Sequence, residues 1–176
     1  MRKTATIIAA ALMPLGLTFC GDKNTTVIEG PSAVQMLDEC DPATFNAALG
    51  PNTCTRQGTI TLAQFNAALA AQQLVPEWRF SPTEFTIRVG QSINAMNVGG
   101  EVHTFTEVEN FGGGMVPALN TASGNPVEAP ECADLAANAL VSPGSTFTTD
   151  PATEVGVEHY QCCIHPWMRA TVTVTN

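Results

Sequence analysis

The chain has 176 residues, of which 44% are hydrophobic and 13% charged, so it is long enough for one compact core and too short for a large multidomain enzyme. Its 16 acidic and 7 basic residues give a net charge of -9, which argues against nucleic-acid binding because phosphate contacts need a basic surface. The 14 Gly and 12 Pro predict frequent turns.

Residues 1–20 have the pattern of a secretory signal peptide. Arg2 and Lys3 precede an apolar run from Ala5 to Phe19. This run is shorter than the ~20 apolar residues of a membrane span, and no later stretch approaches that length. We therefore expect the protein to be periplasmic or extracellular, without a membrane span.

The end of this segment, Leu17-Thr18-Phe19-Cys20, resembles a lipoprotein signal in which Cys20 becomes the lipidated first residue. The bulky Phe19 departs from that pattern, which usually has a small residue before the cysteine. Two outcomes remain open from the sequence: a lipid anchor on Cys20, and release without lipid.

Five cysteines follow residue 20, and in an oxidising compartment they tend to pair. Since five is odd, at least one thiol stays free, binds a metal or bridges to another molecule. Cys40 and Cys54 flank a short segment and form the obvious local pair. Cys162 and Cys163 are adjacent, so a bond between them would be strained. We expect one of these two to pair with Cys132.

Two amphipathic helices follow a mixed polar segment, residues 21–39, that we expect to be a tether. The first helix begins at Asp41-Pro42, which supplies an N-cap and a proline at the first helical position. Its residues 45–49 recur as residues 65–69 in the second helix. Two copies are too few for a solenoid, so we predict a disulfide-stapled helical hairpin over residues 40–75.

From residue 76 onward the hydrophobic pattern alternates, as it does in strands. Gly99-Gly100 and Pro143-Gly144 mark turns, whereas the stretch between residues 111 and 141 has no clear periodicity and is too long for an ordinary connection. Several short strands with such turns predict a β-sandwich over residues 76–176. The strands are indicated at residues 85–89, 102–107, 155–159 and 170–175.

The densest chemistry lies just before the last strand, where Cys162, His165 and Met168 fall within seven residues. A thiolate, an imidazole and a thioether together suit copper, and a trigonal copper site with a weak axial Met needs a second histidine. His159 lies an odd number of residues from Cys162 on the same strand and so faces away from it. His103, on a different strand, is the better candidate.

These residues resemble the cupredoxins, the small blue copper proteins that include plastocyanin, azurin, pseudoazurin and amicyanin. The resemblance covers about residues 78–176 and rests on the Gly99–Phe105 segment around the first histidine and on the amicyanin-like spacing of residues 162–168. It implies an all-β, Greek-key sandwich, preceded here by the helical hairpin, that holds one copper ion. The implied ligands are His103, Cys162, His165 and, axially, Met168.

Two features depart from the family, a thiol at Cys163 and an enlarged loop before Cys162. If Cys163 were the ligand, only one residue would separate it from His165, unlike the family pattern. With Cys162 as the ligand, the resemblance implies that Cys132 in the enlarged loop bridges Cys163 and clamps the insert beside the metal.

The function that the resemblance implies is transfer of single electrons between transient redox protein partners, and not catalysis. Hydrogen bonds from neighbouring groups to the ligand sulfur tune such sites, and the position of Thr104 predicts that its amide donates one. In the family the loop histidine reaches the surface through an apolar docking patch, which Pro166, Trp167 and Met115 would form here. We expect a monomer.

Other functions remain as alternatives. A copper-trafficking protein would favour exposed, Met- or His-rich sites, and this chain has only six Met, spread out. A scaffold lipoprotein would use the helical hairpin for binding. Copper oxidases and nitrite reductases need more than the three histidines present, and structural zinc sites prefer four strong Cys or His ligands, rarely Met.

Overall fold

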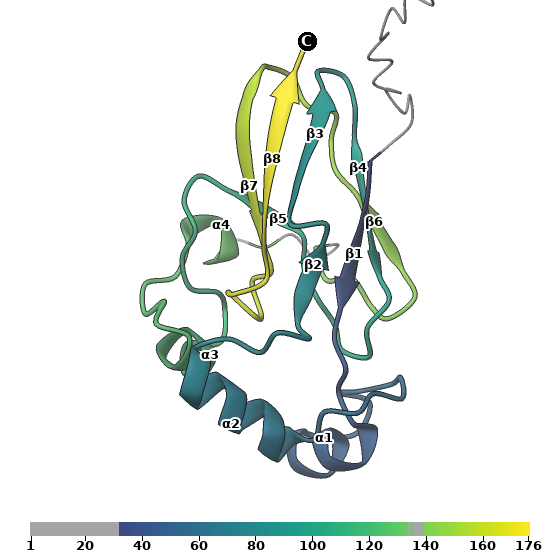
Figure 1. The fold of residues 1–176 in the computed structure, drawn as a ribbon, viewed down its shortest axis with the longest axis vertical. Coiled ribbons are helices and arrows are strands. Elements are labelled where there is room, and N and C mark those ends of the chain that lie inside the picture. Colours follow the sequence, from purple (N-terminus) through teal and green to yellow (C-terminus); the bar gives the residue numbers. More distant parts are fainter. Residues whose placement is uncertain (1–31, 134, 136–138) are drawn as a thin grey trace, which may run out of the picture.

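A computed structural model of the chain describes residues 32–133, 135 and 139–176; the signal-peptide and Cys20 predictions fall outside the described residues. Within them, two four-stranded sheets of order β2-β1-β4-β6 and β3-β8-β7-β5 face each other as a sandwich (Figure 1). The predicted all-β sandwich is confirmed. The elements are β1 (Ser32–Leu37), α1 (Pro42–Leu49), α2 (Leu62–Gln72), β2 (Arg79–Ser81), β3 (Glu84–Arg88), β4 (Ile93–Asn97), β5 (Thr106–Val108), α3 (Pro117–Ala122), α4 (Pro130–Ala133), β6 (Thr146–Thr148), β7 (Gly156–Gln161) and β8 (Arg169–Thr175).

The last strand shows how the alternating pattern sets the fold. In β8, Ala170, Val172 and Val174 are buried in the core, and the threonines between them point the other way. The strand pairs in parallel with β3 and antiparallel with β7. Strand β8 therefore lies between β3, at the edge of this sheet, and β7, which leads into the candidate site.

The tether expected over residues 21–39 is wrong for residues 32–37, which form β1. Val34 and Met36 are completely buried, and β1 lies inside its sheet, antiparallel to β2 and parallel to β4. The sandwich thus includes residues 32–37 and does not start at residue 76. The helices do not precede the sandwich but are inserted after its first strand.

Helices α1 and α2 lie across the end of the sandwich opposite to the C-terminus (Figure 1). Asp41 caps α1, and Thr61 caps α2 through a capping box. The rings of Phe45 and Phe65 meet edge to face with centroids 5.7 Å apart, and both contact the ring of buried Trp78. The helices are therefore part of the main core and not a separate hairpin.

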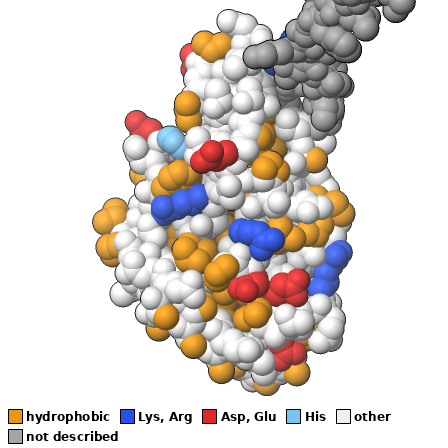
Figure 2. All heavy atoms as spheres, viewed as in Figure 1, with side chains coloured by type: hydrophobic (Ala, Val, Ile, Leu, Met, Phe, Trp, Pro, Cys, Tyr) orange, Lys and Arg blue, Asp and Glu red, His pale blue; other side chains and the backbone are white. Residues whose placement is uncertain are grey.

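The long segment between residues 111 and 141 contains the short helices α3 and α4, and α4 packs beside β5. On the face shown in Figure 2, the Lys and Arg side chains stand apart from one another among acidic and apolar ones. None of the helices in the described part of the chain is long and apolar enough to cross a membrane.

Replacing Phe65 by Ala should remove a ring that joins α2 to the sandwich. Phe65 is 4% exposed, so the free energy of unfolding should fall by about 3–5 kcal/mol. Leu49→Ala, at a side chain that is 57% exposed, should change it by less than about 0.5 kcal/mol. Urea unfolding measures both. Equal stability of the two variants would mean that α2 does not share the core.

Candidate metal centre

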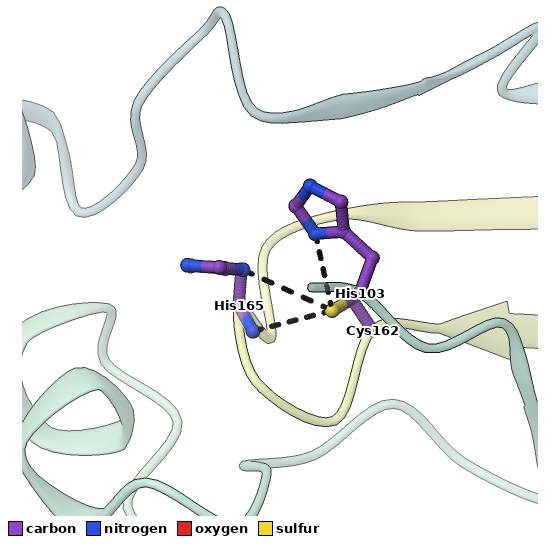
Figure 3. Close-up of side chains that lie close together, drawn as sticks. All are labelled: His103, Cys162 and His165. Atoms are coloured by element: carbon purple, nitrogen blue, oxygen red, sulfur yellow. Dashed lines mark hydrogen bonds between the residues drawn. The ribbon is translucent and has the colours of Figure 1, made fainter. Parts of the chain in front are cut away.

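Three side chains that can bind a metal converge beneath the helices: His103, Cys162 and His165. Their ligand atoms lie within 4.8 Å of one another, and all three residues are buried (Figure 3). Nδ1 of His103 lies 3.8 Å from Sγ of Cys162, and Nδ1 of His165 lies 3.9 Å from it. The two imidazoles therefore present the same kind of nitrogen to one sulfur.

The hairpin of β7 and β8 positions the loop that carries two of these residues. Gln161 pairs with Arg169 at the end of the ladder, and the amide of Cys162 donates to the carbonyl of Met168 at 3.0 Å. The amide of Met168 donates in turn to the carbonyl of His165 at 2.9 Å. Residues 162–168 thus form a closed turn, and the side chain of Met168 at its end is fully buried.

The segment around His103 precedes β5 and lies beside the loop of residues 162–168. His103 and Val141 exchange two backbone hydrogen bonds, and the amide of Thr104 donates to Sγ of Cys162 at 3.5 Å, as its position predicted. Oγ1 of Thr104 accepts the amide of Cys163 at 2.8 Å. These contacts join the loop of residues 162–168, called the ligand loop below, to the segment around His103.

His159, the histidine that the sequence set aside, is not part of this cluster. It lies on β7, opposite Val108 of β5, and its ring meets that of Phe111 with centroids 4.8 Å apart. Its orientation follows from strand alternation, which turns it away from the side of the strand that leads to Cys162.

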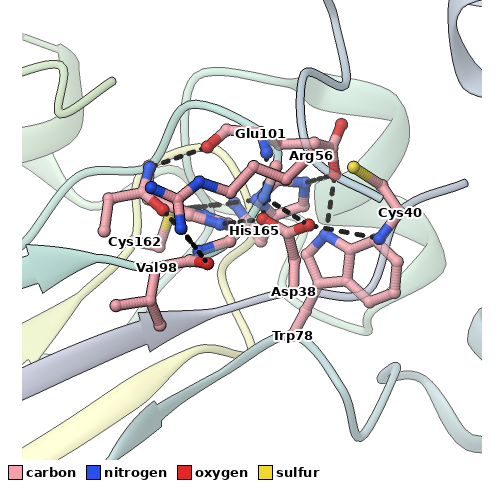
Figure 4. A network of polar contacts seen from close by, with 12 residues as sticks. Asp38, Cys40, Arg56, Trp78, Val98, Glu101, Cys162 and His165 are labelled. Atoms are coloured by element: carbon pink, nitrogen blue, oxygen red, sulfur yellow. Dashed lines mark hydrogen bonds and ion pairs between the residues drawn. The ribbon is translucent and has the colours of Figure 1, made fainter. Parts of the chain in front are cut away.

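Two carboxylates that sequence reasoning missed stand behind the histidines. Oδ2 of Asp38 lies 2.9 Å from Nε2 of His103. Oε2 of Glu101 lies 3.6 Å from Nε2 of His165 and accepts a hydrogen bond from Nε1 of Trp78 at 2.7 Å (Figure 4). Glu101 was visible as a charged residue beside a predicted ligand. Asp38 carried no comparable signal in the sequence, because it lies in the segment of residues 21–39 that was predicted to be a tether.

The buried charges shift one another's protonation. Burial alone would raise the pKa of Asp38, but hydrogen bonds from His103 and from the amides of Glu101 and Gly100 lower it to about 2. Burial alone would lower the pKa of His103, but Asp38 and Cys162 raise it to about 9. Burial opposes ionisation of Cys162, yet the two histidines hold its pKa well below the usual value. The site thus favours a thiolate. Burial raises the pKa of Glu101.

The loop histidine does not reach the surface, contrary to the expectation for it. His165 is 3% exposed, and its ring packs among those of Phe65, Trp78 and Trp167. Pro166 is buried and Trp167 is partly buried. Of the predicted patch, only Met115 is well exposed, at 43%. The reason is the helical insert, because Phe65 of α2 occupies the space over the loop.

Two disulfides frame the site. Cys40 is bonded to Cys54, and Cys132 on α4 is bonded to Cys163, which leaves Cys162 as the free thiol among the described residues. The Cys132–Cys163 bond ties the long segment before β6 to the ligand loop. Gly114 lets that segment approach closely, since a Cβ there would collide with the carbonyl of Cys163.

The donor set matches a soft or borderline metal ion. One thiolate and two imidazole nitrogens are characteristic of copper and zinc sites. In the cluster found among the described residues, only these three Cys, His or carboxylate ligands meet, one fewer than a closed structural zinc site requires. The chemistry of these donors therefore fits a trigonal copper site.

Comparisons with known proteins give structural likeness only. No protein-family model matches the sequence, and no curated protein matches it. Among solved structures, the chain is similar to a purple cupredoxin from Nitrosopumilus maritimus at 16% identity and a TM-score of 0.46, over 82% of this chain and 99% of that one. It is also similar to oxidised plastocyanin from Dryopteris crassirhizoma at 18% identity and a TM-score of 0.42, over 82% and 100%. A mutant amicyanin in the Cu(I) form matches at 18% identity and a TM-score of 0.36, over 55% and 73%.

Gly99 allows the carboxylate of Asp38 to approach the turn of residues 99–101, and Gly99→Ala should disturb this contact. A Cβ at Gly99 would collide with the carboxylate of Asp38, so the free energy of unfolding should fall by about 1–3 kcal/mol. Gly156→Ala, where a Cβ would meet nothing within 4 Å, should change it by less than about 0.5 kcal/mol. Chemical unfolding of the metal-free protein compares them, and an undisturbed Gly99→Ala variant would contradict the close packing.

Proposed function

We propose that the chain is an exported type 1 copper protein that carries single electrons between redox partners. Its copper ligands would be His103, Cys162 and His165, with Met168 as a fourth, weaker ligand. The observation that carries this proposal is the pair of Nδ1 atoms 3.8 and 3.9 Å from one buried sulfur. Met168 is supported by its full burial and by its place at the end of the same closed turn.

Copper held by these residues would supply the Cu(II)/Cu(I) couple, so that a reduced redox protein could give one electron and an oxidised one could take it up. The protein's part is to hold a coordination that suits both states. The backbone bonds that close residues 162–168 and the Thr104 contacts limit the movement of the ligands. Amides of Thr104 and His165 donate to the sulfur, which tunes its bond to the metal.

Burial supports electron transfer over copper delivery. A delivery protein must release its metal to a partner that reaches the ligands, and here all three clustered ligands are buried beneath aromatic rings. Electrons need no such opening. Export is supported by the basic start and apolar run of residues 1–19 and by two disulfides, which persist in oxidising compartments.

The partner would meet the surface near Trp167 and Met115. The ring of Trp167 contacts that of His165 with centroids 5.4 Å apart and is itself partly exposed. The amide of Met115 donates to the carbonyl of Cys163, which keeps this exposed side chain beside the ligand loop. Contacts between electron-transfer partners are small and transient.

Loading the purified protein with Cu(II) should give an intense colour from thiolate-to-copper charge transfer that bleaches reversibly on reduction by one electron per chain. Cys162→Ser should abolish the colour. The double variant Cys132→Ser and Cys163→Ser should keep it, because these sulfurs are bonded to each other and do not belong to the cluster of His103, Cys162 and His165. Absorption spectroscopy with a redox titration measures both, and a colourless wild-type adduct would refute the proposal.

Copper should leave the loaded protein slowly when a strong chelator is added in excess. Phe65→Ala should speed the loss at least about tenfold, because it opens the aromatic cover over His165. Leu49→Ala, at an exposed position of α1, should lose copper at the wild-type rate. The decay of the charge-transfer band follows the loss. Rapid release from the wild type would favour copper delivery instead.

A further inference from the structure

Each of the two histidines is held between the sulfur and a carboxylate. In His103 and in His165, Nδ1 faces Cys162 and Nε2 faces the other way, toward Asp38 and Glu101 respectively. Figure 4 shows these carboxylates in one connected network with His165, Trp78 and Cys162. The arrangement is the same on both sides of the site, although Asp38 follows β1 and Glu101 follows β4.

The carboxylate of Asp38 is fixed from several directions. Oδ1 accepts the amides of Cys40 at 3.2 Å and Gly100 at 2.9 Å, and Oδ2 accepts the amide of Glu101 at 3.0 Å. The side chain is completely buried, as is that of His103. A carboxylate held in this way cannot rotate to follow the imidazole. The imidazole must instead adopt the orientation that the carboxylate sets.

Glu101 makes the weaker of the two contacts. Nε1 of Trp78 donates to Oε2 at 2.7 Å and holds the carboxylate beside the loop. The distance from that oxygen to Nε2 of His165 is 3.6 Å, longer than a normal hydrogen bond, so its influence on the ring is mainly electrostatic.

We propose that Asp38, and more weakly Glu101, are positioning residues that keep the proton of each imidazole on Nε2 and favour the oxidised copper ion over the reduced one. This inference rests on the proposed function. A proton on Nε2 leaves the lone pair of Nδ1 directed at the metal and makes the nitrogen a stronger donor. The negative charge behind each ring then stabilises Cu(II) more than Cu(I).

The charge balance of the site gives the direction of this selection. Asp38, Glu101 and the thiolate of Cys162 place three negative groups around one metal, and among the described residues no Lys or Arg forms an ion pair with them. Cu(II) leaves less negative charge uncompensated than Cu(I). Because charges interact strongly in a buried site, reduction is disfavoured and the reduction potential is lowered.

The reduction potentials of three copper-loaded variants test this direction. Asp38→Asn should lower the ratio of Cu(II) to Cu(I) affinity by about tenfold, which raises the potential by about 59 mV. Glu101→Gln should raise it less, because its contact is longer. Glu39→Gln removes the same charge from an exposed residue next to Asp38 and serves as the control. A shift in Asp38→Asn no larger than in the control would overturn the proposal.

A second measurement needs no copper. In the metal-free protein, proton and nitrogen NMR should show a slowly exchanging Nε2–H of His103, since this atom donates to Asp38 in the interior. The signal should be lost or exchange faster in Asp38→Asn and persist in Glu39→Gln. Its absence from the wild type would overturn the positioning role even if Asp38→Asn fails to fold.

The two proposals fail in different ways. If the copper-loaded wild type is coloured but its reduction potential does not change in Asp38→Asn or Glu101→Gln, the electron-carrier proposal stands and the proposed tuning is wrong. If the wild type binds no copper, both the electron-carrier proposal and the proposed tuning are wrong. The NMR signal then still decides whether Asp38 orients His103.

Discussion

The buried hydrogen bond between Asp38 and His103 is the constraint on which the site depends. A carboxylate without exposed surface must be paired, and here an imidazole and three backbone amides satisfy it. Asp38 follows the central strand β1, and its amide partners lie at the start of the helical insert and in the turn after β4. The one contact therefore links the first strand, the insert and the histidine segment.

The helical insert converts an end of the sandwich into an interior. In its absence the rings of His165 and Trp167 would lose their contacts with Phe65. The Cys40–Cys54 disulfide lies close to the same turn, since a Cβ on Gly100 would come within 2.6 Å of Sγ of Cys40. Strand β1, the disulfide and the helices thus enclose the ligands. Exclusion of water there would strengthen each electrostatic contact with a bound metal ion.

The sequence predicted what is local and missed what depends on distant packing. Cys162, His165 and Met168 form a compact motif, and the alternating pattern of β8 is clear. Strand β1 shows only a short alternation of buried Val34 and Met36, too brief to outweigh the polar segment before it. The cover over His165 could not be predicted, because the position of α2 over the loop follows from aromatic contacts between residues about one hundred positions apart.

Burial and charge act together in this centre. A site open to water would screen the carboxylates, and their influence on the metal would be small. Enclosure by α2 and Trp78 removes that screening, so that the elements that close the site also give Asp38 and Glu101 their effect. In the proposed electron carrier, the same closure would hide the loop histidine from a partner, and the electron would pass through packed side chains such as Trp167. The proposed tuning of the potential and the proposed route of the electron would therefore have one structural origin, the helices inserted after the first strand.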